Sequence, residues 1–278
     1  MQDTTFNEIA DLALRLTGQV IQPSKSYLVK SRLAAICRRE SFSSLDDLAH
    51  CIKSRPNPRF EKEVAAALTS KQTSFFGDRD LLERIVTHAL PHRLKASKTG
   101  RLRVWCAGVA TGQEAYSLAL RLSEEAVPAL KGAEIEIVGT DISPDCIQVA
   151  EAGTYGHFDV QKGLSIHRLM LNFSRQDTGD WRISQKLRDT VSFRLHNLLE
   201  DASSLGQFDV ILCRNVLSQI APSLHARVAQ NLANQLLPGA LLMAGRGESL
   251  TGLLEDLEPS RDVRGAYIRK SKSGAVAA

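Results

Sequence analysis

The apolar positions of the first 90 residues follow a helical period. From Phe6 onward they recur every three or four residues, and Gly18 can end that helix. Pro23 can begin a second helix, which the pattern extends to about Arg39. Further helices are expected over residues 44–54, 58–69 and 79–97. The pattern therefore predicts an all-helical N-terminal domain, with its linker, over residues 1–90.

From about residue 100 the pattern changes to short apolar runs that alternate with helical segments. Buried strands are expected over residues 104–106, 134–142, 207–217 and 240–244. Such alternation is typical of an α/β domain with a parallel sheet, here over residues 91–278. Residues 153–190 break the rhythm, because four glycines punctuate them and residues 180–184 alternate like an antiparallel strand. We expect a small β-rich insertion there, and a disordered tail over residues 270–278.

Residues 103–117 hold a pattern that is typical of a ligand site. The strand that ends at Cys106 is followed by a small-residue turn with Gly108 and Gly112, and a helical pattern starts at Glu114. Glycine lets the backbone approach a ligand closely, and a helix N-terminus offers unpaired N–H groups. The spacing does not match G-x-G-x-x-G, which disfavours a dinucleotide. An acidic residue after the turn suits a ligand with a cationic amine, such as S-adenosylmethionine (SAM). An ordinary tight turn is the alternative.

Polar residues also stand at the carboxyl ends of two other predicted strands. Asp141 ends the second strand, and Arg214 and Asn215 end a later one. In an open α/β sheet, ligands bind outside the carboxyl ends of the strands, so these side chains should gather there. An acidic residue about 30 residues beyond a glycine turn can accept hydrogen bonds from two ribose hydroxyls. Ser143 can cap the next helix, which leaves Asp141 free for a ligand.

Seven short motifs follow one another over roughly residues 60–250. They are 68–76 (LTSKQTSFF), 107–117 (AGVATGQEAYS), 139–143 (GTDIS), 187–199 (LRDTVSFRLHNLL), 208–216 (FDVILCRNV), 237–242 (LPGALL) and 245–249 (GRGES). In this order the set resembles the CheR-type chemotaxis receptor methyltransferases, which transfer a methyl group from SAM to glutamate side chains of chemoreceptors. The resemblance implies the doubly wound sheet of SAM methyltransferases with a small β-rich insertion, preceded by an all-helical domain. The first 60 residues match only loosely.

The resemblance implies a role for each matching residue. Glu114 would hold the methionine ammonium of SAM, and Asp141 would take the ribose hydroxyls. Asn197 and Leu198 would lie beside the adenine, where the asparagine amide can act as both donor and acceptor. The cofactor would be SAM, with S-adenosylhomocysteine as the product.

Further residues of the expected cofactor site come from the linker and from two strand ends. Arg214 and Asn215 would line the methionine end and the methyl-transfer channel, with Arg214 as the catalytic residue. Thr73 would reach over the cofactor as part of a lid. Lys71 and Ala107 complete the expected set.

The chain departs from the family pattern at several of these positions. Gly77 stands where the family has an arginine that contacts the cofactor, and Lys71 stands where it has asparagine. Lys71 or Arg79 is a candidate to replace the missing charge. Gln219 stands where the family has an active-site tyrosine. The alternative to an active enzyme is therefore a diverged, non-catalytic module that binds SAM or docks on receptors.

The second predicted helix is rich in cations. They are Lys25, Lys30, Arg32, Arg38 and Arg39. They could dock the acidic methylation helices of chemoreceptors, in a salt-dependent way. A solvated helix face is the alternative. Nucleic acid is not expected as a partner, because aromatic residues make up only 5% of the chain and Tyr27 alone lies in this stretch.

Charge, residue spacing and apolar run length argue against a disulfide-rich protein, a metalloprotein and a membrane-spanning protein. The formal net charge is only +4, and the five cysteines lack C-x-x-C spacing, as expected of small core residues in a reducing compartment. The seven histidines show neither H-x-x-x-H nor H-E-x-x-H, so no metal site is expected. No apolar run reaches the length of about 18 residues that a membrane span needs. The sequence therefore favours a cytoplasmic protein, which we expect to be a monomer without membrane insertion.

Overall fold

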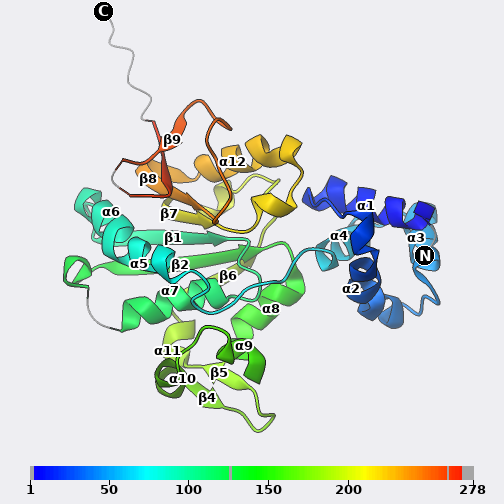
Figure 1. The fold of residues 1–278 in the computed structure, drawn as a ribbon, viewed down its shortest axis with the longest axis horizontal. Coiled ribbons are helices and arrows are strands. Elements are labelled where there is room, and N and C mark those ends of the chain that lie inside the picture. Colours follow the sequence, from blue (N-terminus) through cyan, green and yellow to red (C-terminus); the bar gives the residue numbers. More distant parts are fainter. Residues whose placement is uncertain (1–2, 125–126, 262, 271–278) are drawn as a thin grey trace, which may run out of the picture.

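The computed structural model describes residues 3–124, 127–261 and 263–270. Figure 1 shows a helical domain joined by a linker to a larger domain built on a twisted sheet, with a small insertion below that sheet. The expected disorder of residues 271–278 concerns a segment outside the described residues. Lys270, the first residue of the expected tail, forms an ion pair with Glu258 at 3.4 Å.

The described part of the helical domain forms its own apolar core. Its helices are α1 (Asp3–Thr17), α2 (Ser26–Arg39), α3 (Leu45–Ser54) and α4 (Pro58–Ala67), with a 3-10 turn at Pro23–Lys25. Leu33, Leu48 and Leu68 are fully buried in this core. The prediction of an all-helical N-terminal part is confirmed. So is the end of the first helix at Gly18, whose φ of +73° suits glycine.

The single helix expected over residues 79–97 is interrupted. α5 (Arg79–Arg84) and α6 (Leu90–Ala96) are separated by a π-helical segment, Ile85–Ala89. Pro91 explains the interruption, because it has no N–H to donate and its ring crowds the carbonyl group four residues earlier. The wider π turn removes that conflict.

The packing of α5, the π-helical segment and α6 shows which apolar core they join. Leu81, Ile85 and Leu90 lie in the core beneath the sheet, together with Phe75. Leu68 is buried in the core of the helical domain. The boundary expected near residue 90 stays a prediction. Among the described residues, Leu68 is the last that packs in the core of the helical domain, and Phe75 is the first that packs in the core of the sheet domain.

The larger domain is built on a seven-stranded, mostly parallel sheet. In spatial order its strands are β6 (Val191–Leu195), β2 (Glu134–Asp141), β1 (Arg101–Ala107), β7 (Phe208–Cys213), β8 (Leu236–Ala244), β10 (Ala266–Arg269) and β9 (Leu257–Pro259). The first five run parallel, and β10 and β9 are antiparallel. Ala107 pairs with both Thr140 and Cys213, so the carboxyl ends of β2, β1 and β7 lie level. The strands expected from the sequence are confirmed, whereas β6, β9 and β10 are not predicted by its pattern.

Helices cover both faces of the sheet (Figure 1). The side chains of β1 alternate, so that Val104 lies in one apolar core and Trp105 in the other. α6, α7 (Gln113–Ser123) and α8 (Pro144–Ala152) cover the first face, and α12 (His225–Ala233) covers the second. Short 3-10 helices lie at Pro128–Leu130, Ser203–Leu205, Leu217–Gln219 and Pro222–Leu224. The expected doubly wound α/β fold is confirmed.

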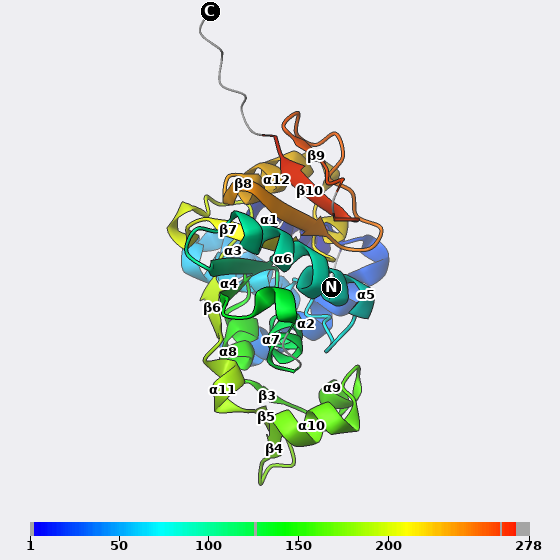
Figure 2. The ribbon, with the colours of Figure 1, turned by 90° about the vertical axis from the view of Figure 1, so that its left-hand side faces the viewer.

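The insertion forms a small antiparallel sheet beside the main one. Its strands are β3 (Thr154–Tyr155), β5 (Trp181–Ile183) and β4 (Phe173–Arg175), in that spatial order. The strand expected over residues 180–184 is therefore present. Between β3 and β4 lie α9 (His157–Gln161) and α10 (Ile166–Asn172), and α11 (Gln185–Arg188) follows β5. Figure 2 shows this unit projecting below the sheet. Its helices are longer than its short strands, so the insertion is less rich in β structure than expected.

A buried ion pair fixes α6 to the sheet at the end opposite the carboxyl ends. The side chains of Arg93 and Asp209 are only 8% and 6% exposed, and the Arg93 Nη2 to Asp209 Oδ1 distance is 3.1 Å. Arg93 Nη1 also donates to the carbonyl group of Pro238 at 3.0 Å, and Asp209 Oδ2 accepts from the backbone N–H of Arg103 at 2.9 Å. Both charged groups therefore have hydrogen-bond partners on more than one side.

Candidate functional site

A cavity of about 290 Å³ opens at the carboxyl ends of β1, β2 and β7. Here β1 has β2 on one side and β7 on the other, which is the switch point of the strand order where open α/β sheets bind ligands. Its wall combines distant parts of the chain: the end of α1, the linker, the glycine turn, the insertion, and the loops after β2, β6 and β7.

The glycine turn after β1 forms the floor of this pocket. Gly108 and Gly112 have φ values of +73° and +93°. A Cβ on Gly108 would lie 2.5 Å from Val216 Cγ2, so only glycine lets the loop after β7 approach so closely. Ala110 has a φ of +49°, a strained conformation for a residue with a Cβ. The expected need for glycine in this turn is confirmed, and α7 begins immediately after it.

Asp141 connects the end of β2 to this turn. Its Oδ2 accepts from the backbone N–H of Ala110 at 2.9 Å, and its Oδ1 accepts from the backbone N–H of Ser143 at 2.9 Å. Burial raises the pKa of the Asp141 carboxyl, and these backbone donors oppose the rise. The Ser143 side chain caps α8 by accepting from the N–H of Cys146, so that cap does not need Asp141. Asp141 lines the pocket, and each carboxylate oxygen keeps a further lone pair for a ligand.

Glu114 and Arg214 meet at another part of the pocket wall. Glu114 lies in the first turn of α7, and Arg214 directly follows β7. The Arg214 guanidinium donates to Glu114 Oε2 and, at 3.3 Å, to Asp78 Oδ2. Burial raises the pKa of the Glu114 carboxyl, although Arg214 opposes the rise. One cation therefore lies between two carboxylates.

Asn197 and Leu198 line the pocket in the loop after β6. The Asn197 amide is partly engaged within the protein, because Nδ2 donates to the carbonyl group of Leu16 at 2.8 Å and Oδ1 accepts from the N–H of Leu199 at 3.0 Å. One N–H and one lone pair remain for a ligand. Among the described residues, the neighbouring buried atom His196 Nε2 has no hydrogen-bond partner.

The helical domain contributes to the pocket through the end of α1. Gln19 forms an isolated antiparallel bridge with Ile220, in which Val20 N donates to the carbonyl group of Gln219 at 3.1 Å. Thr17 and Gln19 line the cavity, and buried Gln19 Oε1 has no partner within the described parts of the chain. The two domains thus build one wall together.

The loop after β7 is held by a single carboxylate. Glu248 accepts from the backbone N–H groups of Asn215, Ser218 and Gly245 at 2.8, 2.9 and 3.0 Å. Asn215, which lines the pocket, has a φ of +56°. Gln219 also lines the pocket, but its Nε2 donates to the Asn215 carbonyl group at 2.7 Å. Glu248 therefore fixes the strained loop that presents Asn215.

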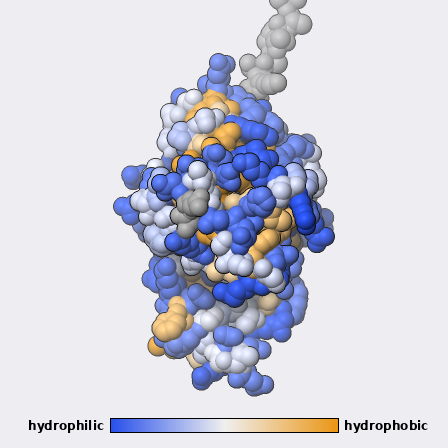
Figure 3. Space-filling model, turned by 90° about the vertical axis from the view of Figure 1, so that its right-hand side faces the viewer, coloured by the Kyte–Doolittle hydropathy of each residue, from blue (hydrophilic) through white to orange (hydrophobic). Residues whose placement is uncertain are grey.

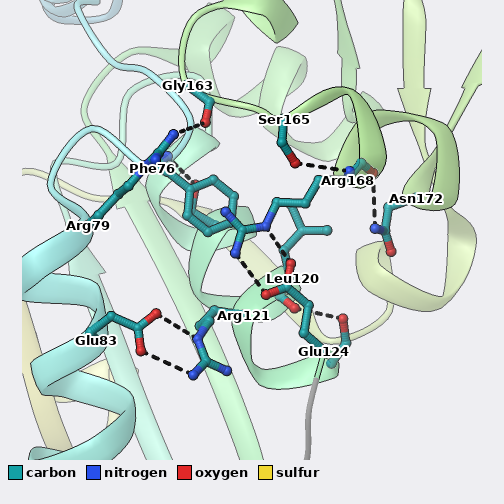
Figure 4. A network of polar contacts seen from close by, with 12 residues as sticks. Phe76, Arg79, Glu83, Leu120, Arg121, Glu124, Gly163, Ser165, Arg168 and Asn172 are labelled. Carbon is teal, nitrogen blue, oxygen red and sulfur yellow. Dashed lines mark hydrogen bonds and ion pairs between the residues drawn. The ribbon is translucent and has the colours of Figure 1, made fainter.

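The linker, residues 69–78 between α4 and α5, crosses the pocket and is anchored by two aromatic rings. Thr73 lines the cavity, and its role as part of a lid stays a prediction. Phe75 is fully buried, with edge-on contacts to Tyr155 and Phe173 of the insertion at centroid distances of 5.0 and 5.6 Å. The Arg168 guanidinium lies 3.9 Å from the centroid of the Phe76 ring (Figure 4). The linker is thereby sandwiched between the insertion and the main sheet domain.

Two of the expected cofactor residues do not line the cavity. Ala107 is the last residue of β1 and packs in the apolar core, while the turn residues that line the cavity are Gly108 to Ala110. Lys71 is not part of the cavity wall and instead forms an ion pair with Asp145 at 3.1 Å. A contact of either residue with the cofactor stays a prediction.

The cations expected to dock the substrate do not all lie on one side of α2. Successive residues turn by about 100° around a helix, which places Arg32 and Arg39 on one side and Lys30 on the other. Arg32 donates to the carbonyl group of Leu68, and Arg39 forms ion pairs with Glu40 and Glu63. These two arginines serve contacts within the helical domain.

The remaining cations of this set are Lys25, Lys30 and Arg38, which are exposed. Figure 3 shows that the face on which the helical domain lies is mostly hydrophilic. For these three residues the docking role stays a prediction.

Several other features limit the chemistry of the described residues. No group of three or more His, Cys, Asp or Glu side chains within them is placed to hold a metal ion. Cys106, Cys146 and Cys213 are buried. Among the same residues, no helix has both the length and the apolarity needed to span a bilayer.

The strand order, the glycine turn and the position of the pocket define the class of protein. A doubly wound, mostly parallel seven-stranded sheet carries a ligand pocket at its switch point, with acidic side chains on β2 and at the start of α7. This is the α/β fold of SAM-dependent methyltransferases.

Comparison with known proteins gives the family. The model described as "CheR methyltransferase, all-alpha domain" matches residues 4–69, and "CheR methyltransferase, SAM binding domain" matches residues 71–264. Chemotaxis protein methyltransferase 1 of Vibrio cholerae is 33% identical over 263 residues, 94% of each chain. Chemotaxis protein methyltransferase 1 of Pseudomonas aeruginosa is 34% identical over 239 residues, 85% of this chain and 86% of that protein. The chain belongs to the CheR methyltransferase family.

Proposed function

We propose that this methyltransferase transfers the methyl group of SAM to glutamate side-chain carboxylates of chemoreceptors, giving glutamate methyl esters. The observation that supports it most is the pocket in which Asp141 and Glu114 come together at the carboxyl edge of the sheet. The two acids offer separate partners for the ribose hydroxyls and the methionine ammonium. Two buried atoms of the wall, Gln19 Oε1 and His196 Nε2, have no partner among the described residues and suit a polar ring such as adenine near Asn197.

The protein's own residues would act by binding and orientation. Bound SAM would supply an electrophilic methyl group. A glutamate carboxylate is already ionised at neutral pH, with an ordinary pKa of about 4.3, so the protein needs no general base. Its task is to hold the carboxylate in line and to exclude water, and such orientation can contribute about 7–11 kcal/mol in the best cases. Arg214, Asn215 and Thr73 all line the pocket, and we propose them for this role.

The proposed substrate determines the cellular compartment in which the protein would act. The methylation helices of chemoreceptors lie in the cytoplasm, so we propose that the protein is cytoplasmic and acts there as a monomer. Neither nucleic acid nor membrane insertion has a part in this proposal.

Replacing Asp141 with asparagine should weaken SAM binding by about 1–3 kcal/mol, because the ribose hydroxyls lose a charged hydrogen-bond acceptor. Asparagine keeps an acceptor for the N–H of Ala110 or Ser143, whereas alanine would leave both unpaired. Calorimetric titration with SAM and S-adenosylhomocysteine measures the effect. Asp145→Asn is the control, because this nearby carboxylate is 77% exposed and pairs with Lys71. Unchanged SAM affinity of Asp141→Asn would show that the ribose assignment is wrong.

Charge reversal on α2 tests the docking role of its exposed cations. Lys30→Glu/Arg38→Glu should lower kcat/KM for the receptor about five- to tenfold at low ionic strength, and less at high salt. SAM affinity should not change. Lys98→Glu/Lys131→Glu is a matched control, because it makes the same charge change at exposed residues near the amino ends of β1 and β2. Equal loss in both variants, or none in either, would assign Lys30 and Arg38 to a solvated face.

A non-catalytic role is the second candidate, and two positions favour it. Gly77 contributes no side chain to the pocket, and the Gln219 amide is turned toward the backbone of Asn215. A protein of this kind would bind SAM but form no methyl ester on receptor. Tritium transfer from labelled SAM to receptor glutamates separates the two functions.

A further inference from the structure

Lys162 is a pocket residue that the sequence analysis does not single out. It lies in the insertion, just after α9, and lines the same cavity as Glu114, Asp141 and Arg214. Its side chain is exposed, and none of the ion pairs or hydrogen bonds among the described residues involves its ammonium. The cavity therefore has a cation at its wall that is free to meet a ligand.

The backbone next to Lys162 is held tightly against the linker. Gly163 has a φ of +105°, and a Cβ there would lie 1.7 Å from the carbonyl oxygen of Phe75. Figure 4 shows Arg79 reaching from α5 to the carbonyl group of Gly163, with an Nη2 to O distance of 3.4 Å. The fit fixes the base of Lys162 beside the linker residues that cross the pocket.

Charge balance distinguishes Lys162 from the other cation of the wall. Arg214 is shared between Glu114 and Asp78, so its charge is already matched by two carboxylates. Asp141 adds a further negative charge. A ligand that brings its own carboxylate into this acidic pocket needs a cation with no partner, and Lys162 is the one that the described wall provides.

The two cations suggested by the sequence to replace the missing arginine at position 77 do not line the cavity. Lys71 pairs with Asp145, and Arg79 holds the Gly163 carbonyl group. Gly77 leaves its part of the wall without a side chain, and Lys162 reaches the same cavity from the insertion.

We propose that Lys162 is the carboxylate-binding cation of this pocket. The inference rests on the proposed function and deepens it. The carboxylate has two sources, the methionine part of the cofactor and the substrate glutamate. In either case the ammonium of Lys162 forms a charge-assisted hydrogen bond with it, and no covalent step is involved.

Ligands with and without the carboxylate test the proposal. S-adenosylhomocysteine carries the amino-acid group, and 5′-methylthioadenosine lacks it. If the cofactor is the source, Lys162→Met should raise the Kd for S-adenosylhomocysteine about tenfold and leave the Kd for methylthioadenosine unchanged. If the glutamate is the source, both dissociation constants should stay the same and the KM for receptor should rise about tenfold. Lys162→Arg should recover most of the loss.

Lys186→Met is the matched control, because Lys186 is an exposed lysine of the insertion that does not line the cavity. The proposal is overturned if Lys162→Met leaves all three constants unchanged, or if methylthioadenosine loses as much affinity as S-adenosylhomocysteine. Failure of the wild-type protein to bind S-adenosylhomocysteine would instead contradict the proposed function itself. The two failures are therefore distinguishable in the same titrations.

Discussion

Replacing Arg93 with leucine should lower the free energy of unfolding by about 3–5 kcal/mol. Arg93 supplies the positive charge that faces Asp209 in a buried pair, and both side chains are less than a tenth exposed. Without the guanidinium, Asp209 keeps the N–H of Arg103 as a partner but remains a buried, uncompensated charge. The carbonyl group of Pro238 also loses its donor.

Denaturant unfolding of the full-length protein measures this effect. Arg101→Leu is the control, because the Arg101–Glu134 pair on β1 and β2 is 69% and 68% exposed. Exposed pairs of this kind contribute about 0–1 kcal/mol. Equal losses in the two variants would contradict the assignment of a special role to the buried pair.

Replacing Glu114 with glutamine should weaken SAM binding by about 1.5–3 kcal/mol, the range for a hydrogen bond to a charged group. Glutamine matches glutamate in shape but cannot offer a full charge to an ammonium. Arg214 keeps Asp78 as a partner, so the wall should stay in place. The affinity for methylthioadenosine, which lacks the ammonium, should not change. An equal loss for this truncated ligand would show that Glu114 supports the pocket rather than the methionine group.

The same variant gives a pH-dependent stability effect. Burial raises the pKa of the Glu114 carboxyl, so the folded protein holds this proton more tightly than the unfolded chain. The stabilisation is fully present below the ordinary pKa of a glutamate side chain and is lost as the pH rises through the folded-state pKa. Glutamine does not titrate. The unfolding free energy of wild type minus that of Glu114→Gln should therefore fall as the pH is raised, in denaturant titrations from about pH 4 to about pH 7.

The features of the site that depend on neighbouring residues are predictable from the sequence. A strand, a glycine turn and a helix start follow one another within residues 101–123, so the turn at Gly108 and Gly112 needs no distant partner to be recognised. Ser143 caps its helix locally, which correctly leaves Asp141 for the pocket. The interruption at Pro91 is equally local, and could be anticipated from the missing N–H.

The rest of the site depends on contacts between distant segments, which a hydrophobic pattern does not encode. Asn197 reaches Leu16 across 181 positions, and Arg214 reaches Asp78 across 136. Lys162 enters the pocket only because the insertion folds back onto the linker. Conversely, Arg32 looks like a solvated cation in the sequence, but the fold directs it to the backbone of α4's C-terminal end at Leu68.

Because the bridge between Gln19 and Ile220 joins the two domains at the pocket, ligand binding and domain docking should be coupled. Its residues wall the pocket from both domains, so under the proposed function the cofactor binds well only while the domains are docked. By linkage, a ligand present at a hundred times its Kd favours the docked arrangement by about 2.7 kcal/mol. The supply of methyl donor would then influence what fraction of the protein has its two domains docked through this bridge.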